Sequence, residues 1–323
     1  TPLKIVGSRL LQAIPRLLCT VLANFLNIHA APGDPVSMIV GEGGLPAAAV
    51  AELRTAFGLD QPLYVQFFAY LANVLRGDLG ISFMYQQPVT EIIASRLPAT
   101  LLLMLSAYLV STLLGLLIGT IAALRPGSVL DRILMTVAVI GYSVPAFWLG
   151  FLAVLLFAVE LGLFPVSGMV DPGAAASGPA RWLNILHHLV LPVSVLSLFY
   201  TGLIARLMRA SMVSVLRSDF VLTARTMGLP PLRVVLRHAF PNAVTPIITV
   251  LGLQIGLMLS GAVLTETVFG WPGLGTMTVQ AVSQRDYPLL LGMLFLTSVT
   301  VIIANVLTDL FYLVINPKLR ANG

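Results

Sequence analysis

The sequence has little charge and almost no cysteine or lysine. Only 10% of its 323 residues are charged, whereas a soluble domain carries about a quarter. Its one cysteine, Cys19, excludes an internal disulfide and a cysteine-rich metal site. Its two lysines, Lys4 and Lys318, do not follow a glycine, and the G-x-x-x-x-G-K-[ST] signature is missing. The chain itself is therefore not expected to hold ATP in a phosphate loop.

The residues needed for a metal site or for nucleophilic catalysis are also sparse. The four histidines, at positions 29, 187, 188 and 238, lack zinc-ligand spacing with cysteine or glutamate. His187 and His188 are neighbours, which would point about a hundred degrees apart on a helix and form a poor chelate. Ser143 has no histidine in its own apolar segment that would act as a base. We expect no enzyme and no cofactor in this chain, with an active site assembled only by folding as the alternative.

Long apolar segments dominate what the sequence does contain. Hydrophobic residues make up 58% of the chain, and the mean hydropathy is +0.96. About twenty residues cross the hydrocarbon of a bilayer. Six segments reach that length, at residues 10–28, 99–124, 133–159, 186–205, 243–264 and 289–315. The sequence predicts an all-α, polytopic membrane protein with six transmembrane helices in a single domain, residues 1–323.

The first apolar segment has two interpretations. Lys4 and Arg9 precede it, and His29-Ala30-Ala31 follows it. This arrangement is similar to a signal peptide with its small-residue cleavage site. We favour a membrane span, because five more apolar segments follow. Arg16 lies inside it, and an arginine at the centre of a span costs about 2.5–3.5 kcal/mol. We therefore expect its side chain to reach the interface or to face a protein neighbour.

Basic residues gather on one side of the predicted membrane. With the amino terminus inside, the cytoplasmic parts hold thirteen lysines and arginines, and the external parts hold five. The positive-inside rule then places both termini and residues 206–241 in the cytoplasm, with residues 32–97 outside. The basic residues lie in alternate loops between the predicted spans, on one side of the membrane, and not on one face of a soluble domain. We therefore expect no nucleic-acid partner.

Residues 206–241 contain the densest run of positive charge. Apolar residues recur at helical spacing over residues 214–227, which predicts a helix. Gly228 is expected to end this helix, and Pro230-Pro231 prevent its continuation. A second, basic helix is predicted at residues 232–239. The segment is interpreted as a docking element, with an arginine-rich helix lying on anionic lipid as the alternative.

This segment resembles the cytoplasmic loop of permeases of binding-protein-dependent ABC importers, in the dipeptide, oligopeptide and nickel branch. Ala224, Gly228 and Pro241 match the family's small-residue helix, its glycine and its later proline, although Leu222 and Thr223 replace the leading Glu-Ala. In that family the helix enters a groove on the ATPase subunit. The resemblance thus implies an ATPase-coupling site made of Arg217, Asp219, Thr223, Ala224, Arg225, Gly228 and Pro241.

Further motifs outside this segment resemble the same family. Pro32-Gly33-Asp34-Pro35, FGLDQPL at 57–63 and GDLGIS at 77–82 follow one another in order. With short helices predicted at 46–57 and 62–75, they indicate a compact external cap over residues 32–97, between spans 1 and 2. ETVFGWPGLG at 266–275 also matches the family and predicts a sharp external turn, with Phe269 and Trp271 in an interfacial belt.

Polar residues inside the predicted spans mark a candidate translocation path. GYSVPAFWLG at 141–150 resembles the family's third span, and its proline predicts a bent helix that packs on protein. Tyr142, Ser143, Gln254 and Asn305 are the residues that we expect along the path. Asp309, four residues after Asn305, either shares this interior or lies near the inner headgroups. The scarcity of inward His, Cys and carboxylate groups disfavours a naked metal ion as cargo.

The resemblance covers nearly the whole chain and implies a type I ABC importer permease with a MetI-like fold in the bacterial inner membrane. It implies a second homologous permease, two ATPase subunits that hold ATP and Mg²⁺, an external solute-binding protein and surrounding membrane lipid as partners. Short peptides are the expected cargo, with a nickel chelate, glutathione or another small polar solute as alternatives. A channel, a secondary transporter and a scaffold without transport are the alternatives from other classes.

Overall fold

The computed structural model of the chain describes residues 2–30, 46–56, 58–173 and 177–315. Within this part the regular structure is helical, apart from one isolated bridge between Ile81 and Pro88. The chain divides into two compact units. Unit 1 combines Thr1–Ala99 with Gly273–Val306, and unit 2 combines Thr100–Pro272 with Leu307–Gly323. The predicted motif Pro32-Gly33-Asp34-Pro35 lies outside the described residues.

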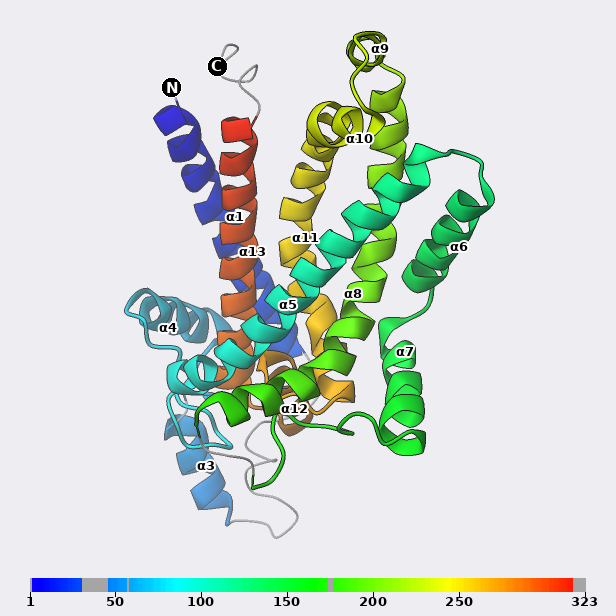
Figure 1. Cartoon of the computed structure of the whole chain (residues 1–323). Helices are drawn as coiled ribbons and strands as arrows, with labels where there is room; N and C mark the ends of the chain where they lie inside the picture. The colour runs from blue at the N-terminus through cyan, green and yellow to red at the C-terminus, as the bar shows by residue number, and fades with distance from the viewer. Residues whose placement is uncertain (1, 31–45, 57, 174–176, 316–323) are drawn as a thin grey trace. The chain divides into compact units, whose positions relative to one another are not determined.

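Unit 1 contains two short helices between longer ones. Its helices are α1 (Pro2–Ala30), α3 (Ala47–Ala56), α4 (Leu63–Leu75), the start of α5 (Val89–Leu124), α12 (Leu274–Gln284) and most of α13 (Tyr287–Ile315) (Figure 1). Phe25 of α1 meets the rings of Phe67 and Tyr70 of α4, with centroids 5.3 and 6.2 Å apart. The Tyr70 hydroxyl donates a hydrogen bond to the Leu291 carbonyl at 3.3 Å. These contacts hold α4 against α1 and α13, and both short helices predicted from the sequence are confirmed.

A buried carboxylate fixes the turn that precedes α13. Arg285 adopts a positive φ of 55°, and the next residue, Asp286, is fully buried. Its carboxylate accepts hydrogen bonds from the Ser82 hydroxyl at 2.5 Å and from the Phe83 backbone N–H at 3.2 Å. It also accepts from the Leu289 N–H in the first turn of α13. A buried charge that is met by several donors in this way ties residues 82–83 to the start of α13.

Unit 2 is organised around one long helix. Its elements are the rest of α5, then α6 (Val129–Ser143), α7 (Ala146–Ala153), η1 (Val154–Glu160), α8 (Pro179–Leu216), α9 (Asp219–Thr226), α10 (Pro231–Arg233), η2 (Val234–Ala239) and α11 (Phe240–Val268). Helices α6, α7 and α11 all pack against α8. Sixteen residues of α8 are buried, among them Pro192 and the polar residues His188, Ser197 and Thr201, so protein and not lipid surrounds them.

Glycines bring the helices of unit 2 into close contact. A Cβ on Gly115 of α5 would lie 2.6 Å from Ile204 of α8, and one on Gly119 would lie 2.5 Å from the Ala205 carbonyl oxygen. On the other side of α8, a Cβ on Gly202 would overlap the carbonyl oxygen of Ala138 in α6. These contacts leave room only for hydrogen, as is common where helices pack within membranes.

The predicted third span is two helices. Helix α6 ends at Ser143, Val144 is extended with ψ of 133°, and α7 starts at Ala146 at an angle of 100° to α6. Pro145 lacks an N–H and disfavours helical geometry in the residue before it, which is why the break falls at Val144. The bend predicted for residues 133–159 is confirmed, and it is larger than a kink.

Each predicted span coincides with a helix or, for the third, with a helix pair. By length and hydropathy, three helices of the described residues qualify as membrane-crossing: α5, α8 and the continuous stretch Pro231–Gly252. The pair α6 and α7–η1 becomes a fourth if it is counted as one broken span. Many large apolar side chains of these helices are exposed, as expected where lipid is the solvent. The count of six spans stays a prediction.

The placement of Phe269 and Trp271 differs from the sequence prediction. Both were expected in an interfacial belt, but both side chains are buried within unit 2. The chain reverses at Gly270, whose φ is +56°, and the Trp271 N–H donates to the Glu266 carbonyl at 2.8 Å. The Gly168 N–H donates to the Phe269 carbonyl at 2.9 Å, so a neighbouring loop covers the turn. The predicted turn is present, and its aromatic residues are core residues.

Candidate functional sites

The segment predicted to couple to an ATPase starts with a helix break that the sequence did not indicate. The helix expected over residues 214–227 is divided, because α8 continues to Leu216 and α9 begins only at Asp219. Between them Ser218 is extended, with ψ of 153°, and its hydroxyl donates to the Val215 carbonyl at 2.6 Å. This hydroxyl satisfies a carbonyl at the end of α8, where the helix cannot supply a partner. Figure 1 shows α9 beyond the C-terminal end of α8.

Helix α9 is held by its apolar face. Val221 and Ala224 are buried in a cluster with Met208 and Met212 of α8 and Val234 of η2. Ala224 therefore faces the chain's own core, and the groove of a partner subunit would meet its neighbours on the other face of α9. Its small side chain lets α9 lie close to α8 and η2, so its contribution to the site is to position the helix.

The opposite face of α9 and the turn after it expose apolar and basic side chains together. Its members are Arg217, Phe220, Leu222, Thr223, Arg225, Met227 and Leu232. Asp219 lies in the first turn and Arg225 in the last, which suits the helix dipole. Beside this face lies an open groove of about 620 Å³, lined by Arg225 together with Leu216, Leu229 and Leu232 among others. An apolar surface with a basic rim is typical of a protein-binding site.

Gly228 ends α9 as predicted. Its φ is +77°, in the left-handed region that favours glycine, and its N–H donates to the Arg225 carbonyl at 3.0 Å. No atom lies within 4 Å of the position that a Cβ would take. Glycine is thus needed at this position for its backbone conformation, not for space.

The second helix predicted after Gly228, at residues 232–239, is longer than expected. It begins at Pro231 as α10, widens into the π-helix η2, and runs directly into α11. Pro241 is exposed in the first turn of α11 and does not separate the two. The wider turns of η2 accommodate its ring and its missing N–H. The loop and α11 are therefore one continuous helical stretch.

A salt bridge that sequence reasoning missed joins α6 to α8. Asp131, buried at the start of α6, accepts hydrogen bonds from Nε and Nη2 of Arg209 at 2.5 and 2.6 Å. It also accepts from the Gly127 N–H at 2.7 Å. Asp131 and Arg209 are 78 residues apart in the sequence. The one sequence signal for a salt bridge is that Asp131 is an acidic residue in a short loop with basic residues. Arg209 thus has a structural partner, whereas no side-chain hydrogen bond or ion pair reaches Arg217 or Arg225 within the described part of the chain.

The residues predicted for a translocation path occupy different environments. Ser143 is exposed at the end of α6, and the ring of Tyr142 stacks on Phe199 at 4.9 Å with the Arg206 guanidinium 4.8 Å from its centroid. Gln254 of α11 is only 4% exposed, and neither atom of its side-chain amide has a hydrogen-bond partner among the described residues. The side chain of Asn305, like that of Asp309, lies outside the described part of the chain.

Gln254 is accompanied by another buried polar group without a partner. The Thr201 hydroxyl of α8 is buried and unpaired within the described residues. Ser211 of α8 donates to the Ala243 carbonyl of α11 at 2.8 Å, and both Thr201 and Gln254 lie about ten residues from that contact. If the two helices run antiparallel, as their predicted spans do, Thr201 and Gln254 lie at about the same level. Buried polar groups are normally paired, so this level marks a polar position in an apolar bundle.

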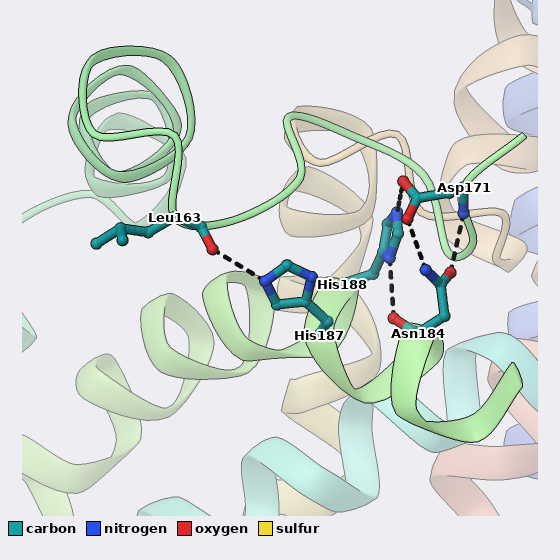
Figure 2. A network of polar contacts seen from close by, with 5 residues as sticks. All are labelled: Leu163, Asp171, Asn184, His187 and His188. Atoms are coloured by element: carbon teal, nitrogen blue, oxygen red, sulfur yellow. Dashed lines mark hydrogen bonds and ion pairs between the residues drawn. The ribbon is translucent and has the colours of Figure 1, made fainter. Parts of the chain in front are cut away.

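The adjacent histidines do not form a metal site (Figure 2). His187 Nε2 contacts the Leu163 carbonyl at 2.9 Å, and His188 Nδ1 contacts the Asn184 carbonyl at 2.9 Å. His188 Nε2 lies 3.5 Å from Asp171, whose other carboxylate oxygen accepts from Asn184 Nδ2 at 2.6 Å. The centroids of the two imidazole rings are 6.4 Å apart, and the ring planes are at 85°. They fasten the chain before α8 to its first turns, and no metal-binding group of three such residues occurs in the described structure.

These features define a class, a helical membrane protein whose long apolar helices pack around α8. Two family models match nearly all of the chain. "Binding-prot-dependent transport system membrane comp, N-term" matches residues 3–104, and "Binding-protein-dependent transport system inner membrane component" matches residues 115–321. The chain belongs to this family of inner-membrane transport components.

Curated relatives match from end to end. The chain is 41% identical over 332 residues to the di/tripeptide transport system permease protein DppB of Pseudomonas aeruginosa, covering 98% of this chain and 99% of that one. It is 38% identical over 335 residues to the dipeptide transport system permease protein DppB of Escherichia coli K12, with the same coverage. A putative peptide transport system permease protein of Brucella abortus is 39% identical over 316 residues, covering 98% of both chains.

Solved structures support the fold. A chain of the MetNI methionine ABC transporter, in inward-facing conformations, superposes with a TM-score of 0.56 at 16% identity, covering 70% of this chain and 97% of that chain. A chain from the crystal structure of an amino acid ABC transporter with histidines gives 0.51 at 18% identity, covering 69% and 94%. The fold is the predicted MetI-like permease fold. The protein is an integral inner-membrane transport subunit, not an enzyme, and it works in a complex with other ABC transporter subunits.

Proposed function

We propose that this chain is the permease subunit through which short peptides, di- and oligopeptides, pass from an external solute-binding protein to the cytoplasm. The observation that carries the proposal is its full-length similarity, at about 40% identity, to permeases named for di- and tripeptide transport. The polar groups of the bundle agree with this cargo. Tyr142, Ser143 and Gln254 offer hydroxyl and amide groups, which suit peptide bonds better than a bare metal ion.

We place the segment 206–241 in the cytoplasm, where its exposed face binds one of two ATPase subunits. Those subunits hold the ATP and Mg²⁺, and a second homologous permease completes the membrane part. The support is the exposed apolar side chain of Met227 beside the arginines at 217 and 225, on a helix whose other face is fixed to α8. Because α9 is held on two sides, a displacement of α9 moves α8 with it.

Peptide import is tested in cells that carry or lack this gene. Uptake of labelled dialanine and trialanine should require the gene and should stop when ATP is depleted. Uptake of nickel chelate and glutathione is measured in the same strains, as the alternative cargoes. Gene-dependent uptake of only these solutes would replace the peptide assignment, and gene-dependent flux that persists without ATP would indicate a channel or a secondary transporter.

Docking of the ATPase is tested with a matched pair of substitutions. Met227 and Leu75 are both highly exposed, 76% and 80%, but Leu75 ends α4 in the predicted external cap. Met227→Asp should lower co-purification of the ATPase at least about tenfold, because an unpaired charge replaces an interface anchor. Leu75→Asp should leave it unchanged. Equal retention of the ATPase by both variants would refute the docking surface.

The orientation is tested by labelling single cysteines in a Cys19→Ser background. Thr226→Cys and Gln87→Cys both place a thiol at an exposed position, at the end of α9 and before α5 respectively. In intact spheroplasts an impermeant maleimide should label position 87 and not position 226, and permeabilised cells should label both. The reverse pattern would invert the proposed topology.

A further inference from the structure

A polar groove lies between α1 and α13, inside the segments predicted to span the membrane. Its volume is about 510 Å³, within the range of small-ligand sites. Helix α1 contributes Arg16, Thr20 and Asn24, which are four residues apart and so share one face. Helix α13 contributes Leu294, Thr297, Ser298, Val301 and Ile302. Five of these eight side chains are polar, a high share for a chain with 58% hydrophobic residues.

The hydroxyl groups of the groove have their hydrogens occupied. Thr20 donates to the Arg16 carbonyl at 2.8 Å, Thr297 to the Met293 carbonyl at 2.9 Å, and Ser298 to the Leu294 carbonyl at 2.7 Å. A hydroxyl that donates in this way keeps its oxygen lone pairs as acceptors. The groove therefore offers acceptors to N–H donors of a ligand, along with the amide of Asn24.

Among the described residues that line the groove, Arg16 is the only charged one and none is acidic. No hydrogen bond or ion pair from the described part of the chain reaches the Arg16 guanidinium. An ionisable side chain inside a membrane normally faces a partner or a cavity that uses it. A guanidinium is suited to bind a carboxylate through two parallel hydrogen bonds. The groove is thus positive at one end and lined with acceptors beyond it.

We propose that this groove binds a short peptide, with its C-terminal carboxylate on Arg16 and its N–H groups on the hydroxyl oxygens and the Asn24 amide. From Arg16 to Asn24 the helix rises about 12 Å. An extended chain spans about 3.3–3.6 Å per residue, so a peptide of about three residues fits this length. The proposal rests on peptides being the cargo. A lipid phosphate is the other anion that offers this chemistry, and the experiment separates the two.

The experiment compares trialanine with trialanine amide as competitors for uptake of labelled trialanine by the assembled transporter. The wild type should prefer the free acid, because only a carboxylate pairs with Arg16. In Arg16→Gln this preference should fall roughly tenfold, as for the loss of a charge-assisted bidentate contact. Arg16→Lys should retain part of it. Arg125→Gln, a change at an exposed arginine outside the groove, should retain all of it.

Each outcome has a separate meaning. If Arg16→Gln imports trialanine and still prefers the free acid as the wild type does, the groove proposal is overturned while peptide import stands. If the wild type imports no peptide, the proposed function fails, and direct binding of trialanine to the purified chain in phosphatidylcholine nanodiscs decides the groove. If Arg16→Gln leaves that binding unchanged and instead loses retained phosphatidylglycerol, Arg16 holds a lipid phosphate and the peptide assignment is wrong.

Discussion

Two kinds of glycine in unit 2 serve opposite needs. Gly228, after α9, has a positive φ and open space around its missing side chain. Gly119 and Gly202 have ordinary helical backbones, and a Cβ at either would collide with the backbone of a neighbouring helix. Gly228 is needed because glycine adopts a positive φ without strain. Gly119 and Gly202 are needed because any side chain would overlap the neighbouring helix. The same residue type thus forms a local turn in one region and a long-range contact in the other.

The difference decides which substitutions each position accepts. A residue that tolerates positive φ, such as asparagine, should replace Gly228 at small cost. It should fail at Gly202, where the obstacle is the carbonyl oxygen of Ala138 in α6. Asparagine therefore distinguishes the two kinds of glycine, and the predictions for Gly202 and Gly228 use it.

The largest effect is expected for Gly202→Val. Its side chain would force α6 away from α8, and overpacking of a close contact costs about 3 kcal/mol. The purified variant should lose thermal stability and yield less monodisperse protein in detergent. Gly202→Asn should be equally damaging, since the limit is space. A melting temperature equal to that of the wild type in either variant would show that α6 and α8 do not pack as closely as described.

The second-largest effect is expected for the salt bridge between Asp131 of α6 and Arg209 of α8. Arg209→Gln leaves Asp131 buried without its counter-ion, which costs about 3–5 kcal/mol in a fully buried pair. Because the Arg209 side chain is 31% exposed, solvent screening reduces this to about 2 kcal/mol. The melting temperature should fall, and Asp131→Asn added to Arg209→Gln should restore part of it. Arg217→Gln, exposed at the end of α8, is the control and should change little; a double variant as unstable as the single one would argue against the pairing.

A smaller effect is expected at Gly228. Gly228→Ala should cost about 1–2 kcal/mol, because only the left-handed backbone is penalised. Gly228→Asn should recover much of that loss, in contrast to asparagine at Gly202. Melting temperatures and ATPase co-purification should follow the same order, wild type, asparagine, alanine. If alanine and asparagine are equally harmful, space and not φ would be the constraint at this turn.

The smallest effect is expected at Pro241. Since the helix runs through this position on the exposed side of α11, Pro241→Ala should change the free energy of unfolding by less than about 0.5 kcal/mol. ATPase co-purification should be retained. A large loss of co-purification with unchanged stability would show that the proline ring itself contacts the ATPase.

Local patterns predicted the helices well and their ends less well. Hydropathy located the segments of α5, α8 and α11, and Pro145 located the break between α6 and α7. The break at Arg217–Ser218 was missed, because neither residue is a helix breaker and the apolar spacing continues across it. Gly228 was recognised because its role is local.

Contacts between distant segments were beyond the reach of the sequence. Nothing near Asp131 indicates that Arg209 is its partner. Likewise, nothing near Phe269 indicates that its carbonyl accepts a hydrogen bond from Gly168, in a loop about a hundred residues earlier. Gln254 was selected as a polar residue in a span, but only the structure shows that its amide is buried without a partner. Arg16 was expected to face a neighbour, and the structure places it on a polar groove with α13.

The length of α8 has a mechanical consequence. Its 38 residues form one helix of about 57 Å, well beyond the roughly 30 Å of hydrocarbon that a span must cross. One end carries α9, and the first turns at the other end are fastened by the contacts of Asp171 with Asn184 and His188. Pro192 lies inside this helix and removes one of its internal hydrogen bonds, and Figure 1 shows that the ribbon of α8 bends along its length. The stretch between Pro192 and α9 is one stiff arm. A displacement of α9 would therefore tilt this arm about the bend, and the loop before α8 would feel it only through the bend.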